Sequence, residues 1–542
     1  MAPAVDPILL SAITFLPLAV GVVLVAVAAL VRGVPEAIFR LAGLATTGLC
    51  FLLSLQLFFQ FDPTDPGYQF VEYRPWIEGY GISYFVGVDG ISLVLVLLTT
   101  FLMPVVLLAS AREPSKSVRS YVFFMLFLET GMLGAFVSLN VFQFYLFWEV
   151  MLIPMYFIIG IWGGPRRIYA AVKFFLFTMF GSLLMLLAML VLYYLHYEQT
   201  GTLNFDLVAR PSVEALGLLD TRVPLSGEAL WWKTQTWLFA AFALAFAIKV
   251  PMVPLHTWLP DAHVEAPTAG SVVLAGVLLK MGTYGFLRFA LPLFPVGATE
   301  LAPWIVGLGV TGIVYGSLVA MVQADIKRLV AYSSVAHLGF VMLGIFAGNA
   351  QGLNGSVLQM VNHGISTGAL FLLVGMLYER RHTRMIDAFG GLAKPMPVYT
   401  LFFAITTMSS IGLPLLNGFV GEFLILLGSF LANPIATVIA TGGVVLGAAY
   451  MLWMVRRVFF GPVSKPENQG LIDLDLREKL VMLAMVIPMF WIGLYPETLL
   501  RRVEPSVLEL MRHVESRGGL STSAPPAGLF AATAAAQPGG EP

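Results

Sequence analysis

Charged residues and cysteines are both scarce in this sequence. Only 11% of the 542 residues are charged and 58% are hydrophobic, whereas a soluble domain carries about 25% charged residues. No soluble fold can bury that much apolar surface, so the sequence predicts a protein whose solvent is largely lipid. The single cysteine, Cys50, excludes a disulfide framework and a self-contained iron–sulfur cluster, which needs several thiolates. A net charge of −1 argues against nucleic acid as a partner.

Long apolar runs are abundant instead. They recur from one end of the chain to the other, at about the 20-residue length that a membrane-crossing helix needs. We therefore predict an all-α polytopic membrane protein with about fourteen transmembrane helices. The first run lacks a preceding basic segment, so we interpret it as a span and not as a cleaved signal. The predicted spans are 8–31, 40–61, 91–110, 119–138, 141–161, 170–195, 232–260, 270–290, 302–322, 327–347, 354–378, 397–431, 435–455 and 480–499.

Prolines interrupt two of these spans. The seventh contains Pro251 and Pro254 and the twelfth contains Pro414, and a proline inside a helix removes a hydrogen bond and kinks it. Spans 4–8 and spans 9–13 form two sets of equal size, and the broken span is the fourth in each set. Because each set has an odd number of spans, the second set enters the membrane from the opposite side. The pattern predicts two inverted repeats, a transporter plan in which broken helices mark the ion site.

The predicted organisation follows these repeats and the distribution of charge. The loops after odd-numbered spans hold most of the lysines and arginines, among them Arg112, Arg166 and Arg380. By the positive-inside rule these loops are cytoplasmic, which places both termini on the external, periplasmic side. The predicted parts are three helices in 1–118, the first repeat in 119–290, the second in 302–460, the final span in 461–502, and an external tail in 503–542 with disorder from residue 518.

Several lysines and glutamates lie deep within predicted spans. Placing such a charge at mid-bilayer costs roughly 2.5–3.5 kcal/mol, so these residues usually face protein or water and serve a function. Lys280 lies about 15 Å into span 8, too deep to reach the membrane surface by snorkelling. Lys249 just precedes the break in span 7, and Glu149 in span 5 could pair with it or could be a protonated carboxyl bonded to a backbone carbonyl. Glu422 follows the break in span 12, in the place that Lys249 holds in the first repeat.

Several further residues leave alternatives open. A lone buried histidine is more often a packing residue, but His337 and His363 lie midway along adjacent spans, and this favours a proton relay. Glu129 in span 4 is equally well interpreted as a relay carboxylate or as a structural hydrogen-bond donor. The group that follows the break in span 7 either lines an access path or caps and cross-links the break; it consists of His256, Asp261, His263 and Glu265.

Two other kinds of site find no support in the spacing of residues. The interval from His256 to His263 matches no recognised metal-ligand pattern, and no cysteine supports it, so we predict no metal site. Gly307, Gly309 and Gly312 spell G-x-G-x-x-G, but they lie inside a span with no preceding strand. We interpret them as a helix-packing face and not as a dinucleotide site. The chain is therefore expected to bind no cofactor of its own.

Four stretches resemble the signatures of one known family. They are LFWEVMLIPMYFIIGIWG, KVPMVPLHTWLPDAHVEAPTAGSVVLAGVLLKMGTYG, IKRLVAYSSVAHLGF and GLPLLNGFVGEF. Over essentially residues 8–500 the chain is similar to the antiporter-like subunits of respiratory complex I. Glu422 is an acid where the L and N types of these subunits typically carry lysine. The chain also ends soon after its last span, without the long lateral helix of the L type. The acid at position 422 and this short end therefore favour the third type of antiporter-like subunit over the L and N types.

The resemblance implies a proton-translocating subunit that is driven by redox chemistry elsewhere. It implies FMN, iron–sulfur clusters and quinone on partner subunits, neighbours of the L and N types, surrounding lipids, and a place in the bacterial inner membrane. Glu149 and Lys249 would form the pair of the first half, and Glu422 would end the channel. Glu129 is not carried over from the family. The central hydrophilic axis would consist of Lys280, His337 and His363.

Three alternatives remain at this stage. One is a subunit of a multi-subunit cation/proton antiporter, which shares this ancestry, and a close variant is a hydrogenase- or ferredoxin-linked membrane complex. The subunits that co-purify with the chain distinguish these two from complex I. The second is a scaffold that transports nothing, which predicts that neutralising Lys280 leaves proton flux intact while harming assembly. The third is an enzyme with its own active site, for which the sequence shows no nucleophile, metal or cofactor motif.

Overall fold

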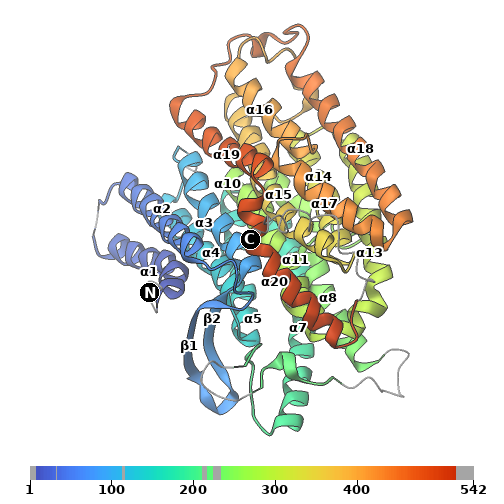
Figure 1. Cartoon of the computed structure of the whole chain (residues 1–542). Coiled ribbons are helices and arrows are strands. Elements are labelled where there is room, and N and C mark those ends of the chain that lie inside the picture. Colours follow the sequence, from blue (N-terminus) through green and yellow to red (C-terminus); the bar gives the residue numbers. More distant parts are fainter. Residues whose placement is uncertain (1–7, 32, 113–115, 210–215, 224–232, 521–542) are drawn as a thin grey trace, which may run out of the picture.

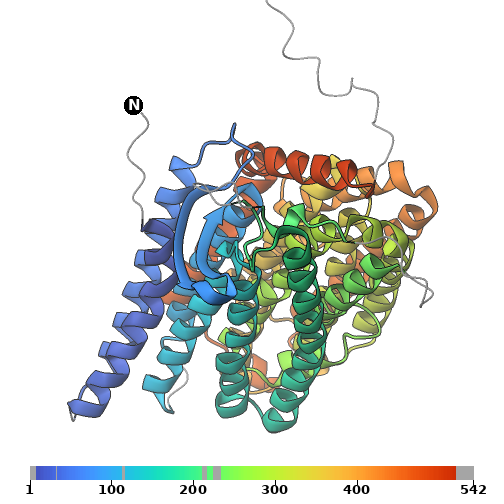
Figure 2. The ribbon, with the colours of Figure 1, turned by 90° about the horizontal axis from the view of Figure 1, so that it is seen from below.

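The computed structural model describes residues 8–31, 33–112, 116–209, 216–223 and 233–520. Within these residues eleven helices are long and apolar enough to cross a membrane, or up to twelve if one bent pair counts as a single span. Figure 2 shows most of them side by side, so the predicted polytopic helical membrane protein is confirmed. The eleven are α1 (Leu9–Leu30), α2 (Glu36–Gln60), α3 (Gly90–Ala109), α4 (Val118–Val137), α5 and α6 together (Val141–Trp162), α7 (Arg167–Thr200), the segment Thr268–Leu293, α13 (Pro295–Met321), α14 (Ile326–Ile345), α15 (Ala350–Arg381) and α18 (Pro434–Phe459).

The helix is interrupted at both places where the sequence predicts a broken span. In the first, α8 (Thr234–Lys249) ends two residues before Pro251, and α9 (Trp258–Glu265) follows after a turn. In the second, α16 (Pro397–Ser410) and α17 (Asn417–Ala432) flank a turn that contains Pro414. Prolines cannot donate the backbone hydrogen bonds that would continue the helix through these turns. Each broken segment therefore leaves free helix ends inside the helical bundle.

The segment Thr268–Leu293 is almost entirely buried and is not a regular α-helix. It consists of α10 (Thr268–Val273), a π turn (Leu274–Leu278), α11 (Leu279–Gly285), a second π turn (Phe286–Ala290) and α12 (Leu291–Leu293). The equally buried α15 packs beside it. Figure 1 places α11 and α15 near the middle of the molecule and α1 and α2 at one edge. Single π turns are frequent at functional sites, and here they lie on both sides of Lys280.

A β-hairpin corrects the prediction of a purely helical chain. Strands β1 (Gln69–Ile77) and β2 (Ile82–Val88) pair antiparallel between α2 and α3. The segment is too polar to be a span, and it lies between the second and third predicted spans. Asp89, directly after β2, accepts a hydrogen bond from the Ser92 backbone N–H and caps α3.

The end of the chain also differs from the prediction. The final predicted span, 480–499, corresponds to α19 (Leu476–Leu494), and the next helix, α20 (Glu497–Ser516), turns away from it by 68°. Residues 503–516, predicted as the start of an external tail, are therefore helical. Figure 2 shows this last helix lying across one end of the bundle, where Ser506 Oγ accepts a hydrogen bond from the Gly90 backbone N–H at 2.9 Å. The predicted disorder from residue 518 falls mostly in 521–542, outside the described residues.

Candidate functional site

A buried lysine and a buried histidine meet at the centre of the molecule. Lys280, in α11 between the two π turns, is fully buried and its Nζ contacts His363 Nδ1 on α15 at 2.6 Å. The same Nζ also donates a hydrogen bond to the carbonyl oxygen of Ala275, which belongs to the first π turn. The sequence predicts a functional role for both residues, and the structure brings them into direct contact.

A histidine–glutamate pair lies next to this contact. The rings of His363 and His337 are 5.7 Å apart between centroids. His337, on α14, places its Nδ1 3.0 Å from Glu422 Oε1 on α17. A row of four predicted residues thus runs through the buried centre, in the order Lys280, His363, His337 and Glu422.

Polar residues that the sequence analysis did not single out complete this row. Gln359 donates its amide to Glu422 Oε1 at 3.1 Å, and Asn362 donates to the backbone oxygen of Asn417 at 2.7 Å. A very small cavity of about 10 Å³, room for about one water, is lined by both histidines and by such polar residues. Gln359, Asn362, His363 and Ser366 are spaced at three and four residues along α15, which puts them on one helix face. From this spacing, a polar face on the helix could have been predicted from the sequence.

The predicted pair Glu149 and Lys249 lies on the other side of α11. Lys249 is 1% exposed, and its Nζ has no hydrogen-bond partner among the described residues but lies 4.5 Å from the centre of the Trp148 ring. Glu149 follows Trp148 in α5, and its charge interacts with that of Lys249. Gly282 of α11 packs directly against the helix end that carries Lys249, since a Cβ there would come within 2.7 Å of the Phe246 oxygen. The two lysine-bearing helices are thus in contact, although no hydrogen bond joins Lys249 to Lys280.

Glu129 faces away from this row. It is fully buried in α4 and neither carboxylate oxygen has a hydrogen-bond partner among the described residues. Its charge interacts with Cys50 on α2, and Val122, two turns earlier on the same face of α4, packs against Gly43, seven residues before Cys50. Glu129 therefore points towards the α2 edge of the molecule, not towards the central histidines.

This position predicts a small effect for Glu129→Gln. Because glutamine keeps the shape and removes only the ionisation, we expect proton translocation by the assembled complex to change less than twofold, below about 0.4 kcal/mol. The measurement is proton uptake by vesicles per NADH oxidised. A tenfold loss with normal assembly would instead put Glu129 on the proton path.

The acids and the histidines that follow the break between α8 and α9 make different contacts. Asp261 pairs with Lys173 of α7 at 2.7 Å, and Glu265 accepts a hydrogen bond from the Arg166 backbone N–H at 2.9 Å. These contacts cross-link the break to the start of α7. His263 instead stacks on Phe371 at 4.6 Å, with both ring nitrogens lacking a partner among the described residues.

The two histidines of this group therefore differ from the acids. The charge of His263 interacts with those of Lys280 and His363, so it lies close to the central row. His256 packs edge-on against Tyr315 at 5.3 Å. A role of either histidine in an access path stays a prediction, since no contact joins them directly to the row.

Comparisons with known proteins identify the family of the chain. Residues 138–447 match the family model "NADH:quinone oxidoreductase/Mrp antiporter, TM", and residues 67–135 match the amino terminus of NADH-ubiquinone oxidoreductase chain 4. NADH-quinone oxidoreductase subunit M of Rhodobacter capsulatus is 51% identical over 512 residues, which cover 93% of this chain and 96% of that protein.

Solved structures give the same result at the level of the fold. A chain of respiratory complex I from Thermus thermophilus superposes with a TM-score of 0.81 at 33% identity, covering 93% of this chain and 99% of that one. A chain of the Mrp complex from Dietzia sp. shares the fold, with a TM-score of 0.76 at 22% identity over 94% of this chain and all of that one. The coverage and identity of the subunit M relatives decide between these two groups. The chain belongs to the antiporter-like family of NADH:quinone oxidoreductase membrane subunits, on its subunit M branch.

Proposed function

We propose that this chain translocates protons as a membrane-arm subunit of an NADH:quinone oxidoreductase and is driven by redox chemistry on other subunits. The observation that carries the proposal is the buried row from Lys280 to Glu422. Its first contact, between Lys280 and His363, is 2.6 Å long and its last, between His337 and Glu422, is 3.0 Å long. Groups that gain and lose protons near neutral pH are suited to such a row. The family assignment indicates that the redox chemistry is that of an NADH:quinone oxidoreductase.

The mechanism starts at Glu149 and Lys249. A nearby carboxylate favours the charged form of a lysine, so moving Glu149 away makes Lys249 a better proton donor. Separating opposite charges that are 4 Å apart costs about 4 kcal/mol at the effective dielectric of a protein. Moving one charge against 100 mV requires about 2.3 kcal/mol. A conformational change in the membrane arm that alters this pair therefore changes the proton affinity of Lys249 by an energy of the same order as that needed to move one proton.

The later steps follow the row of contacts. Lys280 receives the proton and passes it to His363 through their hydrogen bond. The cavity beside His337 has the polar lining that a bridging water needs to cross the gap between the two rings. His337 then hands the proton to Glu422. Release from Glu422 to the outer face or to a neighbouring subunit completes the cycle.

The finer topology forms part of the same proposal. Fourteen spans with both termini external would accommodate all the helical segments at the predicted positions. Residues 119–290 and 302–460 would form the two inverted repeats, and each holds its broken segment, α8–α9 or α16–α17, as the fourth span. Subunits of the L and N types would lie on either side in the bacterial inner membrane. FMN, the iron–sulfur clusters and the quinone site would belong to other subunits.

The test is to make Glu149→Ala and Lys249→Ala in the assembled complex. We expect proton translocation per NADH oxidised to fall tenfold or more, which corresponds to a rate-limiting barrier higher by about 1.4 kcal/mol or more. Lys465→Ala and Glu467→Ala, which alter exposed residues of one loop, are the matched controls and should pump normally. Normal pumping by both Glu149→Ala and Lys249→Ala would falsify the assignment. Co-purification with antiporter subunits and no NADH-oxidising partner would favour the cation/proton antiporter instead.

A further inference from the structure

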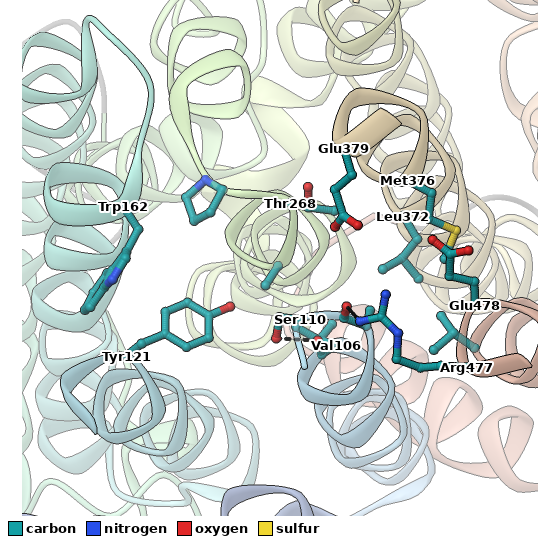
Figure 3. Close-up of a pocket in the computed structure, with 14 residues that line it drawn as sticks. Val106, Ser110, Tyr121, Trp162, Thr268, Leu372, Met376, Glu379, Arg477 and Glu478 are labelled. Atoms are coloured by element: carbon teal, nitrogen blue, oxygen red, sulfur yellow. Dashed lines mark hydrogen bonds between the residues drawn. The ribbon is translucent and has the colours of Figure 1, made fainter. Parts of the chain in front are cut away.

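Helices α3, α15 and α19 pack together, and a cavity lies at each end of this contact. The cavity in Figure 3, at the start of α19, has room for about 80 Å³, and Glu379 and Glu478 lie on the same side of it as Arg477. The cavity at the other end is an apolar groove of about 400 Å³. Ligand pockets of proteins measure roughly 300–1,000 Å³, so only the groove has the size of a binding site.

The groove is apolar on every side. Buried side chains of α3 and α15 form its floor, α2 and α19 form its walls, and the first turn of α20 closes one end. Among the described residues that line it, Thr498 is the one side chain with a hydroxyl group and none is charged. A polar ligand would lose its hydrogen bonds to water in such a groove, so the groove is suited to a hydrocarbon.

The groove opens on the outer surface of the chain. Phe59 on α2 and Ile487 on α19 line it and are 74% and 58% exposed. The apolar surface continues along the same two helices, where Leu52 and Leu483 are also exposed. Both helices correspond to predicted spans, so the hydrocarbon of the bilayer surrounds this surface. A ligand can therefore enter the groove directly from the membrane.

The length of the groove matches one leaflet of the bilayer. From Phe51 to Phe59 the wall formed by α2 is about 12 Å long, and half of the roughly 30 Å hydrocarbon core is about 15 Å. A helix with its side chains is at least about 10 Å wide, so it would need roughly 900 Å³ over the same length. The groove holds less than half of that volume. An acyl chain therefore fits the groove, and a helix of a neighbouring subunit does not.

A cation lies at the closed end of the groove. The Arg502 guanidinium lies 3.9 Å from the centre of the Phe58 ring and donates to the backbone oxygens of Phe58 at 3.3 Å and Thr498 at 2.8 Å. Phe58 and Thr498 both line the groove. Within the described part of the chain, the charge that acts on this guanidinium is the like charge of Arg501, and no carboxylate offsets it. Arg502 is therefore placed to bind an anion at the end of the apolar space.

We propose that this groove binds one acyl chain of a phospholipid whose phosphate lies at Arg502. Arginine pairs readily with phosphate through charge-assisted hydrogen bonds. The acyl chain fills space that would otherwise leave the walls without van der Waals contacts. The phosphate fixes the direction of the lipid, with the headgroup at α20 and the end of the chain towards Phe101 and Ala484.

The bound chain would support the helix that carries His363. Val361 and Ile365 line the groove and are two residues before and two residues after His363, which places them on the opposite face of α15. The lipid would therefore pack against the back of this helix. It would bind there whether or not the proposed proton path is correct.

The experiment uses the assembled complex in vesicles that contain a phosphatidylglycerol with a photoactivatable group on one acyl chain. Labelled peptides are mapped by mass spectrometry. With the group at the end of the chain, we expect labels around Phe101 and Ala484, and with the group next to the headgroup, around Phe58 and Thr498. Labelling of the exposed face of α1, which includes Val22, reports contact with bulk lipid and is the reference.

Two variants test the two parts of the site. Ala484→Phe places a ring in the groove and should reduce labelling around Phe101 about fivefold relative to α1, whereas Leu483→Phe, at an exposed neighbour outside the groove, should not. Arg502→Gln should reduce the same labelling about threefold, and Arg502→Lys, which keeps the charge, should retain most of it. Arg512→Gln alters an exposed arginine farther along α20 and should change nothing.

A second readout identifies the occupant without altering the interior of the groove. A photoreactive amino acid in place of Ile487 should capture phospholipid. Capture of a neighbouring subunit instead would overturn the proposal. Normal labelling around Phe101 in Ala484→Phe or in Arg502→Gln, or the reverse order of labels along the groove, would also overturn it.

Discussion

Replacing Lys280 by methionine is expected to abolish proton translocation through this chain while the complex still assembles. Methionine keeps an unbranched side chain in the same buried space but has no group to hold the proton. A proton that crosses this gap without a carrier faces at least the cost of a charge in the bilayer core, roughly 2.5–3.5 kcal/mol. A barrier higher by that amount slows transfer about 100-fold. The measurement is the number of protons taken up per NADH oxidised, with the amount of assembled complex measured in parallel.

Lys280→Arg separates a relay from a structural role. Arginine keeps the positive charge beside His363 and the hydrogen bond to the Ala275 carbonyl, but it does not release a proton in proteins. If Lys280 carries the proton, Lys280→Arg pumps as poorly as Lys280→Met. If Lys280 only holds the helices together, Lys280→Arg restores both assembly and pumping. Restoration by arginine, or normal pumping by methionine, would contradict the relay and favour the scaffold.

Replacing Arg288 by methionine is expected to have the largest effect on stability. Arg288 lies in the second π turn and is 8% exposed. Its guanidinium donates to Tyr284 at 3.1 Å, to Tyr68 at 2.7 Å and to Asp89 at 2.5 Å. Removing one partner of a buried ion pair typically costs about 3–5 kcal/mol, because the other charge is left uncompensated. We expect little assembled complex, and a lower temperature of dissociation for what remains.

Two further variants identify the cause. Asp89→Asn together with Arg288→Met removes the stranded carboxylate, and asparagine caps a helix as well as aspartate does. The double variant should therefore assemble better than Arg288→Met alone. Arg512→Met breaks an exposed ion pair with Glu509 and should cost less than about 1 kcal/mol. A stable Arg288→Met variant, or no recovery in the double variant, would show that the ion pair does not anchor this end of the central segment.

Hydropathy and proline positions predict most of the fold. A run such as that of α14, or the prolines between α8 and α9, determines its element locally, because lipid leaves few alternatives to a helix with satisfied backbone groups. The hairpin was not predicted because its strands are partly polar, as at Glu72 and Arg74, and long apolar runs alone do not detect such strands. Helix α20 was missed because Arg501, Arg502 and their neighbours lower its hydropathy, although its apolar residues recur at helical spacing.

The residues of the site could be predicted from the sequence, but the contacts between them could not. Depth in a span selects Lys280, His337, His363 and Glu422, because a buried ionisable group requires a reason. Which helix face meets which neighbour depends on packing between distant segments, so the order of the row could not be read from the sequence. For the same reason the two interpretations of Glu129, relay carboxylate or structural donor, could not be separated before its neighbour Cys50 was known.

The π turns around Lys280 make this part of the chain unusually sensitive to changes in length. A π turn holds one more residue than an α turn, so a deletion within Leu274–Leu278 can be absorbed by a return to α-helical geometry. That deletion would keep the flanking helix in place but would alter the turn whose Ala275 carbonyl holds Lys280. A deletion between Leu279 and Gly285 falls in regular α-helix, which cannot absorb the loss of a residue. It would rotate the residues that follow, including Arg288, by about 100° about the helix axis. One-residue gaps in an alignment of this segment therefore differ in meaning: a gap before Lys280 changes how the lysine is held, and a gap after it breaks the anchor to Asp89.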